Sequence, residues 1–301
     1  MRGIELSKSC FLNNFLPLLR DRLPEAEGRL AAGLVGAGSE CFGYDDEISR
    51  DHDFCNGFYV WLTDEDDIKY GVELSRIYRE SVSAPISRSA QPAKRGVTTV
   101  RGFYMPYLGS RDLPQSASEW LMIPECALAE ATNGEIFADG PGEFSAIRRT
   151  LRDEIPKDVF KKRLAARLLT MAQAGQYNFS RCLAHGERGA ARMALSEFAS
   201  AAISAAFLIN RRHTPYYKWS LRALGELPVL PELAESVSSL LWETDTEKCA
   251  RLIEEICAAV AAELRRLSLS ASGADYLEAH AYAVFSSIED RDLRRLHILE
   301  G

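Results

Sequence analysis

Apolar positions in the first part of the chain switch between the spacing of helices and that of strands. Residues 4–20 have apolar side chains at helical spacing, which predicts an amphipathic helix that packs against a sheet. The apolar pair Leu34-Val35 ends in Gly36-Ala37-Gly38-Ser39, called the glycine turn below. We expect a strand before this turn, a short helix after it, and a second strand that leads through residues 54–62.

The next elements follow from caps and breakers. Thr63 precedes four acidic residues and predicts a helix to about Glu80, because acids in the first turn complement the helix dipole. Residues 81–96 are rich in Ser, Pro and Ala, which predicts a loop. Beyond it we expect the following elements: a third strand from Gly96 through residues 97–109, a helix that starts at Ser116 or Ser118 and ends at Asn133-Gly134, and a short strand over residues 135–138.

Composition changes after Gly140-Pro141-Gly142. The rest of the chain is rich in Ala, Leu, Arg and Glu and has helical periodicity, with helices expected near residues 143–153, 157–174, 187–211, 230–242, 246–268 and 274–285, and a last one before Gly301. We therefore predict an α+β protein. A mixed β-sheet domain with flanking helices covers residues 1–142, and an all-α domain covers residues 143–301.

Charge and cysteine content narrow the class of protein. The 301 residues carry a formal net charge of −7, so no global field favours nucleic acid, although a local basic patch would suffice for binding. The number of cysteines, 7, is odd and no CxxC pair occurs, which favours neither a disulfide framework nor a zinc site. Because no apolar run reaches membrane length and no signal-peptide pattern begins the chain, we expect a cytoplasmic protein without a membrane partner.

Two aspartates before the second strand are the main candidates for chemistry. On a strand, Asp51 and Asp53 point to one face and His52 to the other. Two carboxylates so close together repel each other unless a cation lies between them, which favours a Mg²⁺-type site with phosphate oxygens completing the shell. The glycine turn can offer backbone N–H groups and a hydroxyl to that phosphate. The competing interpretation is a pair of strand-edge aspartates with ordinary hydrogen bonds.

The spacing from Gly38-Ser39 to Asp51-His52-Asp53 resembles the signature of the DNA-polymerase-β-type nucleotidyltransferase superfamily. The fuller string GSECFGYDDEISRDHD resembles, more narrowly, the DUF4037 family placed in that superfamily. Further similarities lie at residues 97–103, 134–137, 142–144 and 211–219, so that the resemblance covers roughly residues 30–225.

The resemblance implies a nucleotidyltransferase-like fold and an enzyme that transfers a nucleoside monophosphate from an NTP to a hydroxyl, releasing pyrophosphate. Mg²⁺ or Mn²⁺ would be the cofactor and the NTP the donor substrate. The implied site residues are Asp51 and Asp53 as catalytic metal ligands, Gly38 and Ser39 for phosphate, Lys218 for phosphate, and Tyr216 or Tyr217 stacking on the base. For the segment around Tyr216 and Lys218, an interdomain packing cluster remains the alternative.

One departure from the superfamily pattern keeps a second function open. The strand expected to supply a third carboxylate, residues 97–104, contains no acid. The proton acceptor is therefore unassigned. The candidates are Glu73, Glu119, Glu135, Asp139 or a glutamate of the helical domain. We expect a hydroxyl acceptor on a small molecule or a protein side chain rather than on nucleic acid. A catalytically inactive nucleotide-binding sensor is the alternative, and the oligomeric state stays open.

Overall fold

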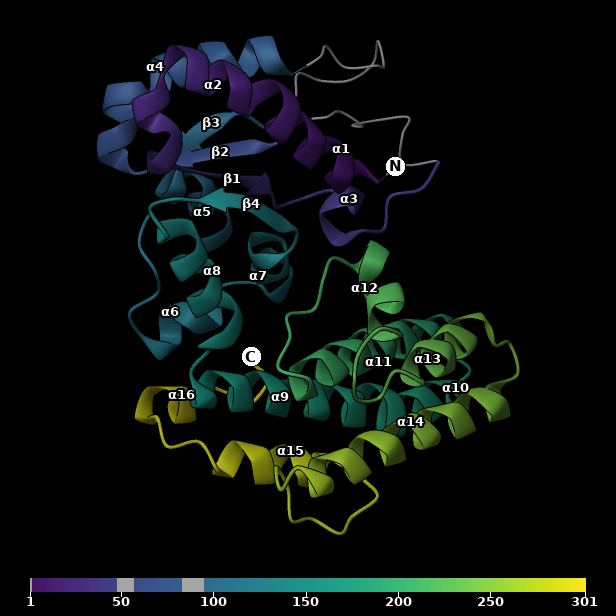
Figure 1. The fold of residues 1–301 in the computed structure, drawn as a ribbon. Helices are drawn as coiled ribbons and strands as arrows, with labels where there is room; N and C mark the ends of the chain where they lie inside the picture. Colours follow the sequence, from purple (N-terminus) through teal and green to yellow (C-terminus); the bar gives the residue numbers. More distant parts are fainter. Residues whose placement is uncertain (1, 48–56, 83–94) are drawn as a thin grey trace. The chain divides into compact units, whose positions relative to one another are not determined.

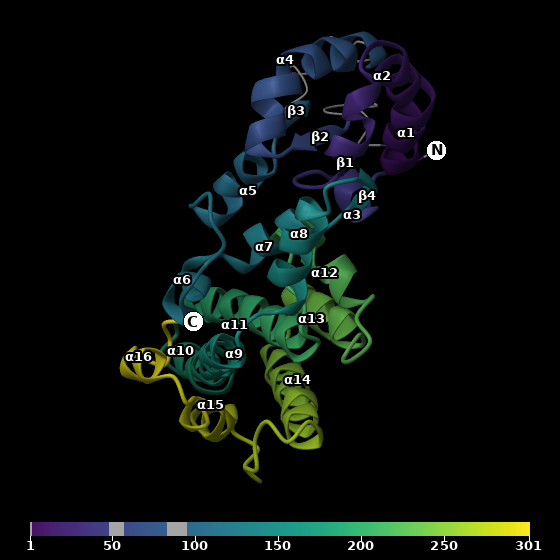
Figure 2. The same ribbon diagram turned by 60° about the vertical axis from the view of Figure 1, so that its left-hand side comes forward.

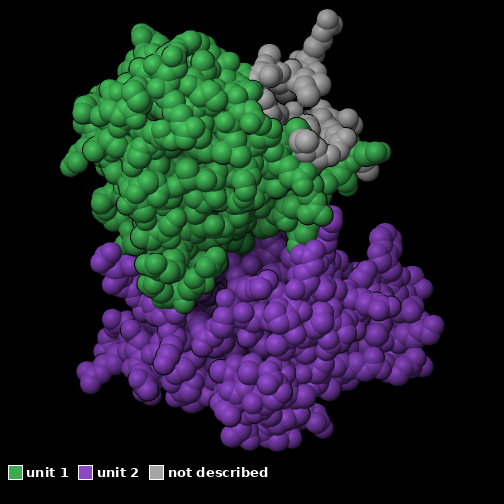
Figure 3. Space-filling model, in the orientation of Figure 1, with its two compact units in different colours: residues 1–113, 127–154 green, residues 114–126, 155–301 purple. Residues whose placement is uncertain are grey.

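The structure is a computed structural model and describes residues 2–47, 57–82 and 95–301. The chain forms two compact units, shown in different colours in Figure 3. Unit 1 contains residues 1–113 and 127–154, and unit 2 contains residues 114–126 and 155–301. The domain boundary expected near residue 142 is inferred from a change in composition, whereas these units are defined by their contacts, so that boundary stays a prediction.

Unit 1 is built around a four-stranded sheet in the order β3-β2-β1-β4. Its strands are β1 (Leu30–Leu34), β2 (Tyr59–Leu62), β3 (Val97–Thr99) and β4 (Glu135–Asp139). β1 is antiparallel to both β2 and β4, whereas β2 and β3 are parallel. The predicted α+β class and mixed sheet are therefore confirmed.

The register brings one end of each of the four strands to the same end of the sheet. Gly33 pairs with Tyr59, and Leu34 with Glu135, so β1 leaves the sheet where β2 and β4 enter it. Because β3 runs parallel to β2, with Val97 paired to Val60, it enters at the same end. The glycine turn after β1 thus lies at the end of the sheet where β2, β3 and β4 begin.

Helices cover both faces of the sheet, as the two views in Figures 1 and 2 show. On one face, Val60 and Leu62 of β2 join an apolar cluster with the N-terminal helices and α4 (Asp64–Ser81). On the other face, Trp61 stacks on Phe144 of α8 (Glu143–Asp153) at 3.7 Å between ring centroids. Alternate residues of β2 are thus buried on opposite faces, as expected for a strand between two layers.

Most predicted elements of unit 1 are confirmed. The helix expected over residues 4–20 appears as α1 (Gly3–Cys10), the π-helical η1 (Phe11–Phe15) and α2 (Leu16–Arg22). Thr63 does cap α4, because its hydroxyl accepts a hydrogen bond from Asp66 N at 3.1 Å. The second strand starts later than expected, since Gly57 and Phe58 precede β2. Two shorter elements complete this region: η2 (Pro24–Arg29) and α3 (Ser39–Phe42).

The prediction of a long third strand is wrong beyond Thr99. Residues Val100–Leu108 form helix α5. The Thr99 hydroxyl accepts a hydrogen bond from Gly102 N at 2.9 Å, so a cap begins the helix directly where β3 ends. Phe103 and Tyr107 then lie one helical turn apart, with ring centroids separated by 5.5 Å. Aromatic residues suit strands, but here their helical spacing and the cap outweigh that preference.

The helix expected between Ser116 and Asn133 is divided in two. The Ser116 hydroxyl caps α6 (Ala117–Met122) by accepting from Glu119 N at 3.2 Å. A second helix, α7 (Glu125–Thr132), follows Pro124. Proline disfavours the helical conformation of the residue before it, which explains the interruption.

Unit 2 is helical, as predicted. Beside α6 it contains α9 (Lys157–Met171), the π-helical η4 (Ala172–Phe179), α10 (Ser180–Ala184), α11 (Arg188–Ile209), α12 (Tyr217–Leu224), α13 (Leu233–Trp242), α14 (Thr246–Arg266), α15 (Leu277–Ser286) and α16 (Arg291–Arg295). By length and composition α11 could cross a membrane, but 67% of its apolar window is buried inside the structure. That burial is typical of a core helix in a soluble protein, and the cytoplasmic location stays a prediction.

Candidate functional site

The glycine turn has backbone conformations that require glycine. Gly36 and Gly38 have φ angles of 116° and 123°. A Cβ atom on Gly36 would come within 2.8 Å of the Tyr107 hydroxyl, and one on Gly38 within 2.7 Å of the Glu40 carboxylate. Both positions therefore exclude a side chain by conformation and by space. The turn approaches other groups closely, while Ala37 and Gly38 remain exposed to solvent.

Ser39 begins α3 and is half-buried. Its carbonyl accepts a hydrogen bond from Tyr44 N at 2.8 Å. Within the described parts of the chain, its hydroxyl has no hydrogen-bond partner. The hydroxyl is therefore available to an external group such as a phosphate oxygen.

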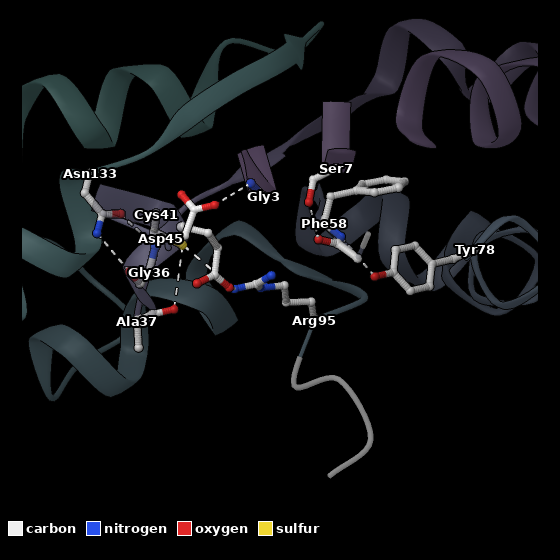
Figure 4. A network of polar contacts seen from close by, with 12 residues as sticks. Gly3, Ser7, Gly36, Ala37, Cys41, Asp45, Phe58, Tyr78, Arg95 and Asn133 are labelled. Atoms are coloured by element: carbon white, nitrogen blue, oxygen red, sulfur yellow. Dashed lines mark hydrogen bonds and ion pairs between the residues drawn. The ribbon is translucent and has the colours of Figure 1, made fainter. Parts of the chain in front are cut away.

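A buried ion pair lies next to the turn, and Figure 4 labels its arginine, Arg95. Arg95, just before β3, donates to the Glu40 carboxylate, and the two side chains are 10% and 11% exposed. The same guanidinium lies 3.9 Å from the Cys41 sulfur, which also contacts the Ala37 carbonyl at 3.6 Å. Burial raises the pKa of the Cys41 thiol to about 12, so Cys41 stays protonated and is a poor nucleophile.

Asp45 contributes a carboxylate near the same turn. Its Oδ2 accepts a hydrogen bond from Gly3 N at 2.8 Å, at the start of α1. Its Oδ1 is buried and lacks a hydrogen-bond partner among the described residues. Asp45 is thus an acid of this segment with an unused ligand atom, whereas Glu40 is bound to Arg95.

The metal site cannot be assembled from the described residues alone. Over residues 2–47, 57–82 and 95–301, no group of three or more His, Cys, Asp or Glu side chains is placed to hold a metal ion. Asp51 and Asp53, the predicted catalytic metal ligands, lie outside the described residues. The fit of Mg²⁺ therefore depends on those two aspartates, and Asp45 is a described carboxylate beside the turn whose Oδ1 is unsatisfied.

The four named candidates for a third carboxylate all have structural partners. Glu73 pairs with Arg76 at 2.9 Å, and Glu135 with Lys8 at 2.5 Å. Glu119 and Asp139 instead accept hydrogen bonds from backbone N–H groups that precede or begin helices. These roles explain the four acids without any catalytic function.

Sequence reasoning missed Glu130 on α7. This half-buried carboxyl has no hydrogen-bond partner among the described residues, and burial raises its pKa. Its charge acts on Tyr107 and on Cys41, which places Glu130 near the glycine turn. Burial, followed by the charges of neighbouring groups that include Glu130, raises the pKa of the Tyr107 hydroxyl. A glutamate in an amphipathic helix has no sequence signal that separates it from an ordinary solvated one.

The predicted nucleotide contacts of the helical part belong to unit 2. Tyr216 precedes α12, is exposed, and packs on Tyr217 with ring centroids 4.3 Å apart. The ammonium of exposed Lys218 lies 4.9 Å from the Trp219 ring centroid. Tyr216 and Lys218 are thus neighbours within unit 2, whereas Gly38 and Ser39 are neighbours within unit 1.

Comparisons with known proteins give one match. A search of curated proteins and a search of solved structures each found nothing similar. The glycine turn and the segment with Asp51 and Asp53 lie outside the matched residues, but the similarities at residues 134–137, 142–144 and 211–219 lie inside them. Over residues 120–220 the chain matches the family model described as a domain of unknown function (DUF4037), which supports the resemblance to that family.

Proposed function

We propose that this protein is a nucleotidyltransferase that moves a nucleoside monophosphate from an NTP to a hydroxyl and releases pyrophosphate. The observation that carries the proposal is the glycine turn. It combines an exposed backbone with a Ser39 hydroxyl that has no partner among the described residues, at the end of the sheet where β2 enters. Asp51 and Asp53 precede β2 in the chain, which supports a site where their carboxylates and a phosphate bound by the turn are close together.

In this mechanism Gly38 and Ser39 bind a phosphate of the NTP through the turn's backbone and hydroxyl. Asp51 and Asp53 hold Mg²⁺ or Mn²⁺, which when bound supplies positive charge to the triphosphate. The acceptor oxygen bonds to the α-phosphorus, the bond to the bridging oxygen breaks, and pyrophosphate leaves with that electron pair. The proton of the acceptor hydroxyl passes to a carboxylate, for which Glu130 is the best supported described candidate.

The acceptor is, in our proposal, a small molecule or a protein side chain. The formal net charge of −7 disfavours a polyanion as partner and favours a neutral or cationic hydroxyl compound. Exposed Tyr216 and Lys218 in unit 2 would stack on the base and contact phosphate.

A nucleotide-binding sensor without transferase activity is the second candidate. The observation that favours it is that four candidates for the third carboxylate already have a structural partner: Glu73, Glu119, Glu135 and Asp139. A sensor would need the glycine turn and the metal-binding aspartates but no proton acceptor.

The test is incubation of the full chain with each of four α-³²P NTPs and Mg²⁺ or Mn²⁺, with and without fractionated metabolite extract. Transfer of label and release of pyrophosphate are measured for the wild type and for a variant with Asp51→Asn and Asp53→Asn. A variant with Asp64→Asn and Glu65→Gln is the matched control, because it removes two exposed charges at the start of α4.

Transfer by the wild type and the control, but not by the Asp51 and Asp53 variant, would support the transferase. NTP binding without transfer in any fraction would favour the sensor. Absence of NTP binding by the wild type would refute both functions.

A further inference from the structure

The carboxamide of Asn133 pairs with the backbone of Gly36 (Figure 4). Its Oδ1 accepts a hydrogen bond from Gly36 N at 2.8 Å, and its Nδ2 donates to Gly36 O, also at 2.8 Å. Both polar groups of the first residue of the glycine turn are thus bound by one side chain, 97 residues away in the sequence. A two-point contact of this kind fixes the orientation of the peptide groups on each side of Gly36.

Arg148 of α8 binds the backbone of Asn133 and of the residues on either side of it. The Arg148 guanidinium donates to the carbonyls of Thr132, Asn133 and Gly134 at 3.0, 2.7 and 2.8 Å. Thr132 is the last residue of α7, and Asn133 and Gly134 follow it, so the guanidinium binds the carbonyls where the helix ends. Burial lowers the pKa of Arg148, yet an arginine remains charged at neutral pH, so its hydrogen bonds are charge-assisted.

Gly134 adds a steric restraint to the same connection. It has a φ angle of 66°, and a Cβ atom there would lie 1.9 Å from the Leu34 carbonyl. The link between α7 and β4 therefore packs directly on the end of β1, just before the glycine turn. Arg148 thus binds the carbonyl of Asn133, and the next residue, Gly134, contacts the strand that carries the turn.

We propose that Asn133, supported by Arg148, is a positioning residue that holds the glycine turn in the conformation that binds phosphate. Glycine loses more backbone freedom on ordering than any other residue, so a turn with two glycines at positive φ samples other conformations unless it is restrained. A turn that is restrained before the ligand arrives does not have to be ordered by binding. This inference rests on the proposed function, because it assigns the phosphate to this turn.

Asn133 and Arg148 both lie inside residues 120–220, which match DUF4037, whereas the turn that they hold lies outside the matched residues. The support of the site thus comes from a different part of the chain than its glycines. No local pattern around Gly36 indicates that support.

The experiment compares Asn133→Asp and Asn133→Ala with Asn13→Asp and Asn13→Ala in the full chain. Asn133→Asp keeps the size of the side chain and the acceptor for Gly36 N, but it puts an oxygen where an N–H donates to Gly36 O. Asn13 is an exposed residue of the same unit that donates only to Ser9 among the described residues, so its variants match the change in charge and size.

Two readouts are measured beside thermal stability: hydrogen exchange of the peptide that contains residues 36–39, and the affinity for each NTP with Mg²⁺. We expect exchange in this peptide to become about tenfold faster in both Asn133 variants, with β2 peptides unchanged, and NTP affinity to fall about tenfold. Both Asn13 variants should behave as the wild type. A merely structural residue would lower stability without changing affinity in the folded protein.

Unchanged exchange at residues 36–39 in a folded Asn133 variant would overturn the proposal. Faster exchange with unchanged NTP affinity would overturn it as well. If the wild type binds no NTP, the proposed function fails and the phosphate role of Asn133 fails with it. If the wild type binds NTP and the Asn133 variants bind equally well, this inference alone fails.

Discussion

The ion pair between Glu40 and Arg95 allows a quantitative test of the structure. Replacing Glu40 by Gln removes the negative charge and keeps the shape of the side chain. The guanidinium of Arg95 then remains in its buried position opposite a neutral amide. The cost depends on how far water screens the pair, and the exposed fractions of the two side chains, 10% and 11%, show that screening is weak.

The expected magnitude follows from that burial. Breaking a buried ion pair by removing one partner costs about 3–5 kcal/mol of unfolding free energy. The Gln amide can still accept one hydrogen bond, so we expect the lower end, about 3 kcal/mol of unfolding free energy. The pair of Glu73 and Arg76, with side chains 39% and 61% exposed, is the control, and Glu73→Gln should cost only about 0.4 kcal/mol.

The assay is urea unfolding, monitored through hydrogen exchange in peptides of β1 and β2. These peptides report on the unfolding of unit 1 separately from that of unit 2. A double variant, Glu40→Leu with Arg95→Met, should recover most of the loss because it removes both charges of the pair. A cost of less than about 1 kcal/mol for Glu40→Gln would show that water screens the pair as it screens an exposed one. A double variant as unstable as the single one would contradict the electrostatic explanation.

Three further predictions concern the surroundings of the turn. The raised pKa of Glu130 contributes stability that is present below its ordinary value of 4.5 and is lost as the pH rises through the folded-state pKa, so Glu130→Gln should raise the urea midpoint at pH 7 and have no effect near pH 4. Gly134→Ala should cost about 3 kcal/mol or more, against about 1 kcal/mol for Gly109→Ala. Both residues have similar positive φ angles, 66° and 71°, but only at Gly134 would the added Cβ meet a backbone oxygen, at 1.9 Å; equal costs in thermal unfolding would refute the contact. Iodoacetamide at pH 8 should alkylate exposed Cys126 well before buried Cys41, whose pKa is about 12, and peptide mass spectrometry that finds the reverse order would contradict the burial of Cys41.

Local signals predicted most helices and their ends. The helical periodicity after residue 142 anticipated α8, α9, α11, α13 and α14, because an amphipathic helix repeats its apolar positions within a few residues. The Thr63 cap was visible for the same reason, since the hydroxyl and the N–H that it binds are three residues apart. The third strand failed where two local preferences competed, and the cap at Thr99 together with helical packing of aromatic residues prevailed.

The glycine turn was also visible in the sequence. Gly36 and Gly38 adopt positive φ angles, a local requirement that glycine meets more easily than other residues, and Ser39 follows them directly. By contrast, the metal site and the third carboxylate concern residues far apart in the chain. The prediction for Asp51 and Asp53 lies outside the described residues, and the acids proposed as substitutes turned out to have structural partners.

The sequence by itself therefore determined the fold class, the order of most elements and the turn at the end of β1. Only the tertiary structure decided what surrounds that turn: Arg95 against Glu40, Asn133 on Gly36, and Glu130 near Tyr107. The physical reason is distance along the chain. Helical periodicity, caps and glycine conformations act over a few residues, whereas the contacts of Arg95 and Asn133 join groups 55 and 97 residues apart, which only the pairing of strands and packing of helices bring together.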